Sequence, residues 1–142
     1  MTTEQNKERV REFFDKVING RDMTRFDDYL SSNFVEHEPL EPFPPTREGV
    51  RSFFESMRAA FPDLKVSIED MVAEGDKVVA RQMWRGTHKG EFMGVPASGK
   101  TVAFPVIDIL RLADGKATDH WGVPGTLTMM QQIGAIPDQV NG

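Results

Sequence analysis

The residues of this chain best suited to proton transfer are its three histidines, His37, His88 and His120, and one isolated acid, Asp108. Histidine changes charge near neutral pH, so it is the usual proton carrier of enzymes. Asp108 stands in the otherwise apolar run Val102–Leu112. Such an acid either finds a hydrogen-bond donor, as a purely structural group would, or has its pKa raised toward a range useful for catalysis. Both interpretations remain open from the residues alone.

Strand periodicity predicts which of these side chains share a face. In the segment Lys77–His88 one face carries Val78, Ala80, Gln82, Trp84 and His88. Successive side chains of a strand point to opposite sides of the sheet, and Asp108 shares its side with the apolar residues of its own strand. We therefore expect Trp84, His88 and Asp108 to line one apolar pocket. A second His-Trp pair, His120-Trp121, is expected to complete it.

Aromatic side chains are expected to form much of the pocket wall. Phe13, Phe14 and Phe54 lie on the apolar stripes of two predicted helices. Trp84 and Trp121 offer flat surfaces for a planar ligand, although core packing explains such residues equally well. The spacing of the histidines does not suggest a metal site, because no two of them lie two or four residues apart.

The elements that must position these residues can be read from caps and periodicity. Three helices are expected, over residues 3–20, 23–30 and 46–61, with Thr2 or Thr3 and then Thr46 as N-caps. Residues 34–38 are expected to lead from the second helix toward the pocket, followed by a stretch with four prolines. Strands follow over 64–69, 77–88, 102–112 and 116–123, and residues 125–134 form a closing helix. This order predicts an α+β domain with helices on one face of a bent antiparallel sheet.

Length and composition limit the class of protein. The 142 residues are enough for one domain and carry a net charge of −5, with the 17 Lys and Arg scattered along the chain. Binding to nucleic acid needs a concentrated basic face, so no such partner is expected. No segment is apolar enough to span a membrane, and the first residues lack the apolar core of a signal peptide. Without cysteine there is no disulfide or thiolate chemistry, and we expect a cytoplasmic protein.

Several short motifs follow one another at a specific spacing along almost the whole chain. They are Phe61-Pro62-Asp63, Glu74-Gly75-Asp76, Gly86-Thr87-His88-Lys89-Gly90-Glu91-Phe92-Met93-Gly94, Ser98-Gly99-Lys100, Asp108-Ile109-Leu110-Arg111, Asp114-Gly115-Lys116, His120-Trp121 and Gln132-Ile133-Gly134. This set resembles the SnoaL-like polyketide cyclase family, also called ester cyclases. The resemblance implies a single domain over residues 1–142 with the cone-shaped barrel of the NTF2-like superfamily. In that fold three N-terminal helices pack on a curved antiparallel sheet around an apolar cavity, and a short C-terminal helix follows.

The resemblance also implies function. Family members include cofactor-free enzymes that close a polyketide ring by an intramolecular aldol step, so no cofactor and no metal are expected. The resembled fold places His37 at the cavity entrance, ahead of the neighbouring glutamates, and suggests a homodimer through the outer face of the sheet. That face would carry Met83, Ile107 and Ile109 beside Arg81 and Arg111.

One departure from the family pattern bears on the chemistry. The family keeps a carboxylate just after the His-Trp pair as its general acid/base, whereas this chain reads Trp121-Gly122-Val123-Pro124-Gly125 there. Three hypotheses stay open: a cofactor-free enzyme of the cyclase or isomerase type acting on a hydrophobic carbonyl compound, a binding or carrier protein for a small hydrophobic ligand, and an interaction protein with a vestigial cavity. For the enzyme, His120 or His88 would carry the proton near neutral pH, while Asp108 orients a histidine or donates to an enolate. The predicted catalytic residues are His120, Asp108 and His88, and the predicted substrate-binding residues are Trp84, Trp121, His37, Phe14 and Phe54.

Overall fold

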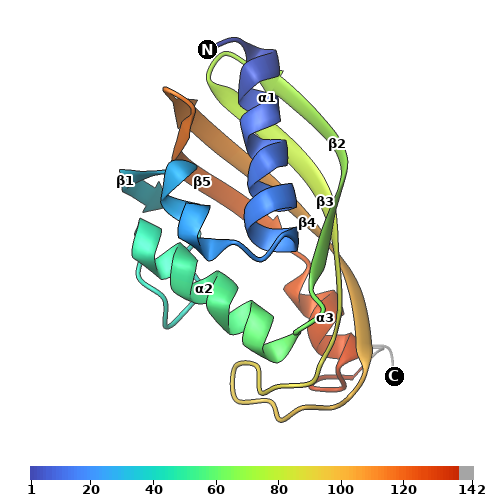
Figure 1. The fold of residues 1–142 in the computed structure, drawn as a ribbon. Coiled ribbons are helices and arrows are strands. Elements are labelled where there is room, and N and C mark those ends of the chain that lie inside the picture. Colours follow the sequence, from blue (N-terminus) through green and yellow to red (C-terminus); the bar gives the residue numbers. More distant parts are fainter. Residues whose placement is uncertain (138–142) are drawn as a thin grey trace.

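The computed structural model describes residues 1–137, and a curved five-stranded sheet forms its centre (Figure 1). The spatial order is β1-β5-β4-β3-β2. All neighbouring strands are antiparallel except β1 and β5, which are parallel. The strands are β1 (Leu30–Glu36), β2 (Lys65–Glu74), β3 (Lys77–Thr87), β4 (Thr101–Ala113) and β5 (Lys116–Pro124).

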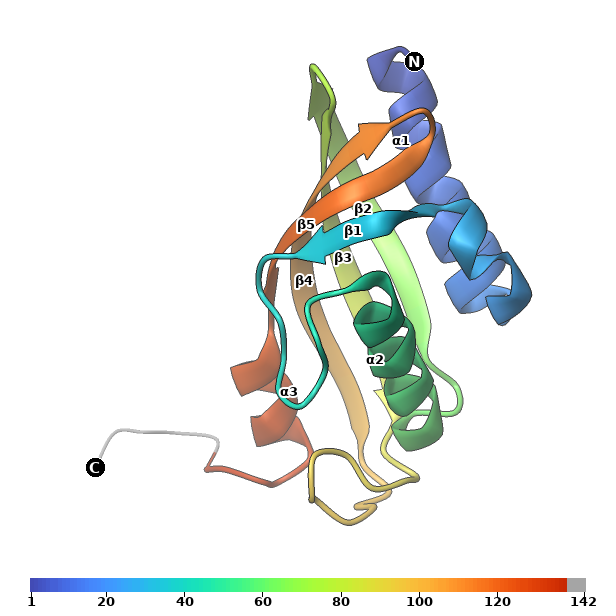
Figure 2. The ribbon, with the colours of Figure 1, turned by 90° about the vertical axis from the view of Figure 1, so that its left-hand side faces the viewer.

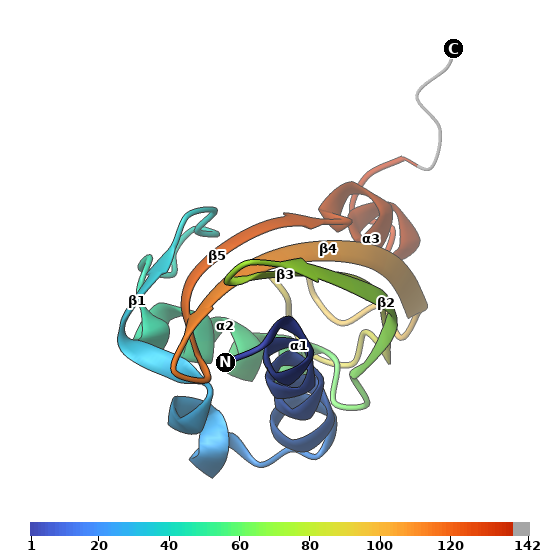
Figure 3. The same cartoon turned by 90° about the horizontal axis from the view of Figure 1, so that it is seen from above.

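Helices cover the concave side of this sheet. The N-terminal helix α1 (Thr3–Glu12) continues into the π-helical turns η1 (Phe13–Asn19), and the 3₁₀ helix η2 (Met23–Asp28) leads into β1. Helix α2 (Arg47–Ala60) joins β1 to β2, and α3 (Thr126–Gln132) follows β5. Seen along α1, the sheet is an arc with α1 and α2 inside it (Figure 3), and α3 lies at the end toward which β5 runs (Figure 2).

Local sequence explains where the two long helices begin. The Thr2 hydroxyl accepts a hydrogen bond from the Gln5 N–H, and the Gln5 side chain accepts one from the Thr2 N–H, which is a complete capping box. The Thr46 hydroxyl caps α2 by accepting from the Gly49 N–H. Both helices turn their apolar residues toward the concave sheet face, where the core lies.

The sheet departs from the predicted one at its first strand. Residues 30–36 form β1, not the end of the second helix and a connection, and η2 already ends at Asp28. The polar segment Ser31-Ser32-Asn33 has weak strand propensity, so the local pattern hides the strand. Its pairing partner is β5, more than 80 residues later, and this distant pairing decides the structure. The α+β class with helices on one face is confirmed, and one of the strand pairs is parallel.

A bulge in β5 lies just before His120. Arg111 of β4 pairs with Asp119 and Leu112 pairs with Ala117, so β5 has one extra residue at this point.

None of the helices in residues 1–137 has the length and apolar character needed to cross a membrane.

Candidate active site

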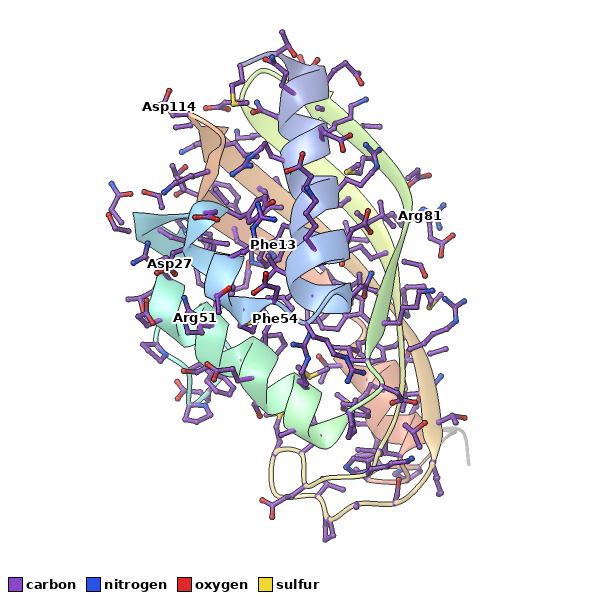
Figure 4. The ribbon with its side chains drawn as sticks, in the orientation of Figure 1. Phe13, Asp27, Arg51, Phe54, Arg81 and Asp114 are labelled. Carbon is purple, nitrogen blue, oxygen red and sulfur yellow. The ribbon has the colours of Figure 1, made fainter. Side chains whose placement is uncertain are left out.

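An apolar cavity of about 170 Å³ lies between the concave sheet face and the helices. Its aromatic wall includes Phe13 and Phe14 of η1, Phe54 of α2 and Trp84 of β3. Figure 4 labels Phe13 and Phe54 near one another among the helices. Their ring centroids lie 5.9 Å apart in an edge-to-face arrangement. Phe54 also stacks on Trp84, with ring centroids 5.8 Å apart. The predicted aromatic wall is therefore present, with Phe14, Phe54 and Trp84 in it.

One wall of the cavity comes from the segment 38–44 between β1 and α2. It contributes exposed Glu38 and Pro39 together with half-buried Leu40 and Phe43. The segment is tied at its base, since the Glu36 N–H donates to the Pro45 carbonyl and the His37 N–H donates to the His120 carbonyl. We call residues 38–44 the strap.

Three charged side chains meet on the sheet side of the cavity. Nδ1 of His120 lies 2.7 Å from both carboxylate oxygens of Glu36, and Nε2 of His120 lies 2.6 Å from Oδ1 of Asp108. All three residues line the cavity. The sheet places them: Glu36 pairs with His120 across the parallel strands β1 and β5, and β4 delivers Asp108 beside them. We call Glu36, His120 and Asp108 the triad.

The two carboxylates keep His120 protonated. Burial alone would lower the pKa of His120, but the hydrogen bonds and negative charges of Asp108 and Glu36 outweigh it and raise the pKa to about 10. The expectation that His120 titrates near neutrality is therefore wrong. At neutral pH the triad consists of one imidazolium and two carboxylates, which leaves one surplus negative charge at the cavity wall.

A second pair of buried polar groups supports Asp108. Nε2 of Gln82 donates to Oδ2 of Asp108 at 2.5 Å, and Nε1 of Trp84 donates to Oε1 of Gln82 at 2.7 Å. Asp108 thus finds donors for both of its oxygens, as the structural interpretation of this acid required. The network runs from Glu36 through His120, Asp108 and Gln82 to Trp84.

Glu36 and Gln82 belong to the site but were not predicted from the sequence. Glu36 was passed over in favour of His37, although Phe34 and Glu36 alternate as inward residues of a strand do. Gln82 was placed on the correct face. A lone amide on the apolar stripe of Val78 and Ala80 could have indicated a polar contact within the site.

His37 and Trp121 lie on the opposite face of the sheet from the cavity. They are the sequence neighbours of Glu36 and His120, and consecutive strand residues point to opposite sides. Their rings stack on each other at 4.5 Å with an angle of 6°. Nε2 of His37 lies 2.9 Å from Oδ2 of Asp119, and the hydrogen bonds from His37 and Thr118 lower the pKa of Asp119. The predicted place of His37 and Trp121 in the pocket wall is wrong.

His88 does not line the cavity either, although it lies on the predicted side of β3. It is fully buried, and its Nδ1 accepts a hydrogen bond from the Ser98 N–H at 3.1 Å. Its backbone N–H donates to the Lys100 carbonyl, and its ring lies 5.5 Å from that of Phe61. These contacts hold the two ends of the loop 88–100 together, so the placement of His88 in the pocket is also wrong.

Two glycines of β5 and its continuation are fixed by close contacts. A Cβ at Gly122 would lie 2.7 Å from Cε1 of His120 and 2.9 Å from Oδ1 of Asp108, so only glycine lets the triad pack against this strand. A Cβ at Gly125 would lie 2.6 Å from the Pro105 carbonyl oxygen. The resemblance implies a carboxylate within residues 122–125, and at position 125 any side chain would require the backbone to move.

The site offers no obvious ligands for a metal. Both ring nitrogens of His120 already face carboxylates, and within residues 1–137 no group of His, Asp and Glu side chains is arranged to hold a metal ion.

Comparison with known proteins agrees with this architecture. The family model of SnoaL-like polyketide cyclases matches residues 8–133. The chain belongs to the SnoaL-like polyketide cyclase family. A curated relative, aklanonic acid methyl ester cyclase DnrD of Streptomyces peucetius, is 29% identical over 109 residues, which cover 75% of this chain and 72% of the relative.

Solved structures show the same fold. TsrD from Streptomyces laurentii superposes with a TM-score of 0.86 at 28% identity, over 96% of this chain and 99% of TsrD. IdmH from Streptomyces antibioticus superposes with a TM-score of 0.80 at 30% identity, over 92% of this chain and 99% of IdmH. The cone-shaped SnoaL-like and NTF2-like fold predicted from the sequence is confirmed.

Proposed function

We propose that this chain is a cofactor-free enzyme of the cyclase or isomerase type, acting on a hydrophobic, carbonyl-bearing, polyketide-like molecule. The observation that carries the proposal is the triad: two carboxylates and one imidazolium on the wall of an otherwise apolar cavity. The wall around these charges is largely apolar, and charges act more strongly in such surroundings than in water.

The surplus negative charge of the triad supplies one equivalent of base. In the proposed reaction a carboxylate removes a proton from the carbon next to a substrate carbonyl, so that a C–H bond breaks and an O–H bond forms. The enolate carbon attacks a second carbonyl carbon of the same molecule and forms the new C–C bond. The resulting alkoxide takes the proton back from the carboxyl group. No external oxidant, reductant or cofactor is needed, because the aldol step is redox-neutral overall and the carboxyl group gives up one proton for the one that it took.

Glu36 is the carboxylate we assign as proton acceptor. Both oxygens of Asp108 are held by buried donors, Nε2 of His120 and Nε2 of Gln82. The two oxygens of Glu36 share one imidazolium N–H, and the other donor is the Glu38 N–H of the strap at 3.1 Å. His120 remains protonated throughout and stabilises the carboxylates, rather than carrying the proton as the sequence suggested.

The substrate class rests on the cavity and on the relatives. The wall is aromatic and apolar apart from a few charged side chains, which suits a neutral molecule with flat rings. DnrD is named for its action on aklanonic acid methyl ester. We take this ester as the first assay substrate for the present chain.

The test follows both ring closure and proton exchange. Purified protein is incubated with aklanonic acid methyl ester in D₂O, and mass spectrometry records cyclised product and deuterium at the carbon next to the carbonyl. Wild type is expected to catalyse at least the exchange. Glu36→Gln should lower the rate by roughly a hundredfold, whereas the matched change Glu38→Gln, in the neighbouring cavity residue, should leave it within about twofold.

The alternative is a carrier that binds the same ligand without turning it over. The carboxylate that the family resemblance implies is absent from residues 122–125, where Gly125 packs against Pro105, and this favours the alternative. Binding measured by quenching of tryptophan fluorescence, with neither exchange nor ring closure for any carbonyl substrate tried, would contradict the enzyme and support the carrier.

A further inference from the structure

Gln82 is a polar side chain buried in the inner wall of the sheet. It is 1% exposed and lies between Ala80 and Trp84 on the stripe of β3 that faces the helices. An amide in this position loses its hydration and must find partners within the protein. Its partners are the Trp84 indole, the Asp108 carboxylate and, at 3.5 Å, the Ala80 carbonyl.

The Trp84 indole fixes which way this amide points. An indole N–H can only donate, so the atom of Gln82 that faces it must be the carbonyl oxygen. The NH₂ group of Gln82 must then face Asp108, which can only accept while it is ionised. Trp84 is itself held by stacking on Phe54 and by a contact with the Phe104 ring at 5.9 Å.

We propose that Gln82, oriented by Trp84, is a positioning residue that holds Asp108 as the anionic partner of His120 and so leaves Glu36 as the proton acceptor. This inference rests on the proposed function for its catalytic consequence. Its physical content, the location of one proton within the triad, can be measured without any substrate.

Removal of the Gln82 amide should move that proton. Without its donor, Oδ2 of Asp108 would be an ionised oxygen in an apolar wall, which is costly. The cheapest remedy is transfer of the Nε2 proton of His120 across the 2.6 Å hydrogen bond to Asp108. The total number of protons stays the same, but His120 becomes neutral and the triad loses its fixed cation.

The first experiment compares wild type with Gln82→Leu, which has a similar volume and no polar atoms. The ¹⁵N chemical shifts of the histidine rings are recorded in the ligand-free protein from pH 6 to 9. In wild type both nitrogens of His120 should show protonated shifts throughout this range. In Gln82→Leu the Nε2 signal should move to the unprotonated position, while the His37 signals on the outer face stay unchanged as an internal control.

A second variant, Gln82→Glu, keeps the experiment decisive if Gln82→Leu does not fold. A protonated Glu at position 82 can donate to Asp108, so His120 should resemble wild type at the lower pH values. The charged groups around it are Asp108 on β4, His120 on β5 and Glu36 on β1. Once the new carboxyl ionises next to Asp108, the two anions repel each other, and Asp108 should take the Nε2 proton. A reversible, pH-dependent shift of Nε2 is therefore expected in this variant alone.

Turnover provides the catalytic readout. A positioning role predicts that Gln82→Leu lowers kcat by about tenfold or more, with KM within about threefold, because Gln82 does not line the cavity. Identical Nε2 shifts in wild type, Gln82→Leu and Gln82→Glu would overturn the proposal. Shifts as expected in a protein that turns over no substrate would support the positioning role and count against the proposed function instead.

Discussion

A histidine–carboxylate pair lies on each face of the sheet, where β1 ends beside β5. On the inner face His120 lies between Glu36 and Asp108, and its side chain is 20% exposed. On the outer face His37 contacts the single carboxylate of Asp119, and its side chain is 35% exposed. The two pairs are neighbours in sequence at both strands, so a shift of one residue in register would exchange their environments.

The surroundings of these two similar pairs give the two histidines different charge and different access to the cavity. The inner histidine is enclosed by two carboxylates, which raise its pKa to about 10 and keep it protonated at neutral pH. It faces an apolar cavity, where its charge can act on a bound molecule. The outer histidine stacks on Trp121, and the Arg111 guanidinium lies 5.5 Å from the same ring. That arrangement packs the outer surface of the sheet, and neither ring lines the cavity on the inner face.

Substitutions of the inner and the outer histidine should differ most in their effect on turnover. His120→Gln keeps an amide N–H donor between the carboxylates but removes the positive charge, so the rate in the deuterium-exchange assay should fall by roughly a hundredfold or more. The matched variant His37→Gln should stay within about twofold of wild type. Equal rates for wild type and His120→Gln would remove the triad from the reaction.

The two pairs should differ next in how strongly each makes the unfolding free energy depend on pH. The pKa of His120 rises from 6.5 to about 10 on folding. Its contribution to stability is therefore fully present below pH 6.5 and is lost as the pH rises toward 10, a change of a few kcal/mol. Urea unfolding of wild type and His120→Gln should show a stability difference that narrows over this range.

His37→Gln serves as the control for that measurement. It should retain the fall in stability that wild type shows between pH 6.5 and 10. A difference between wild type and His120→Gln that is constant across this range would mean that His120 is not held as a cation in the folded protein.

The sequence predicted most of the fold because the fold rests on strong local signals. Capping threonines, the Asp114-Gly115 turn and the alternation along β3 and β4 each specify an element or a face without distant partners. The first strand was missed because its partner lies at the other end of the chain. With β1 unrecognised, no strand parity was available to distinguish Glu36 from His37.

The candidate site was predicted in part for the same reason. Asp108, Trp84 and Phe54 were placed correctly, since a single strand or helix pattern fixes the direction of each. His120 and Trp121 were both assigned to the pocket, although adjacent residues of a strand cannot share a face. The triad itself combines β1, β4 and β5, and no local pattern reports contacts among three strands.

Gly122 should show how tightly the inner face is packed. Gly122→Ala introduces a methyl group within 3 Å of His120 and Asp108, and we expect a loss of about 1–3 kcal/mol in unfolding free energy. The neighbouring residue Val123 points outward and is 72% exposed, so Val123→Ala should change stability by less than about 0.5 kcal/mol. Denaturant unfolding of the two variants under one condition makes the comparison, and equal losses would contradict the packing argument.

Substitutions on the outer face of the sheet, where we expect a homodimer, should have the smallest effect on the triad. Ile107 is 42% exposed, lies beside Val123 and Arg81 in the sheet, and has half-buried Met83 and Ile109 nearby. An apolar surface of this kind is typically covered by a partner, and a two-fold contact would cover it with a second copy.

Sedimentation tests this expectation. Ile107→Lys places a second cation next to Arg81, so two copies of the surface should repel each other, and a dimer of the wild type at micromolar concentration should become a monomer. Met93→Lys, the same type of change at an exposed loop residue, should leave the dimer intact. Because the triad lies on the opposite face, Ile107→Lys should keep the His120 ¹⁵N shifts and stay within about twofold of the wild-type rate. A wild type that is already monomeric would contradict the dimer, whereas an altered His120 signal in the Ile107→Lys monomer would show that assembly and the triad are coupled through the sheet.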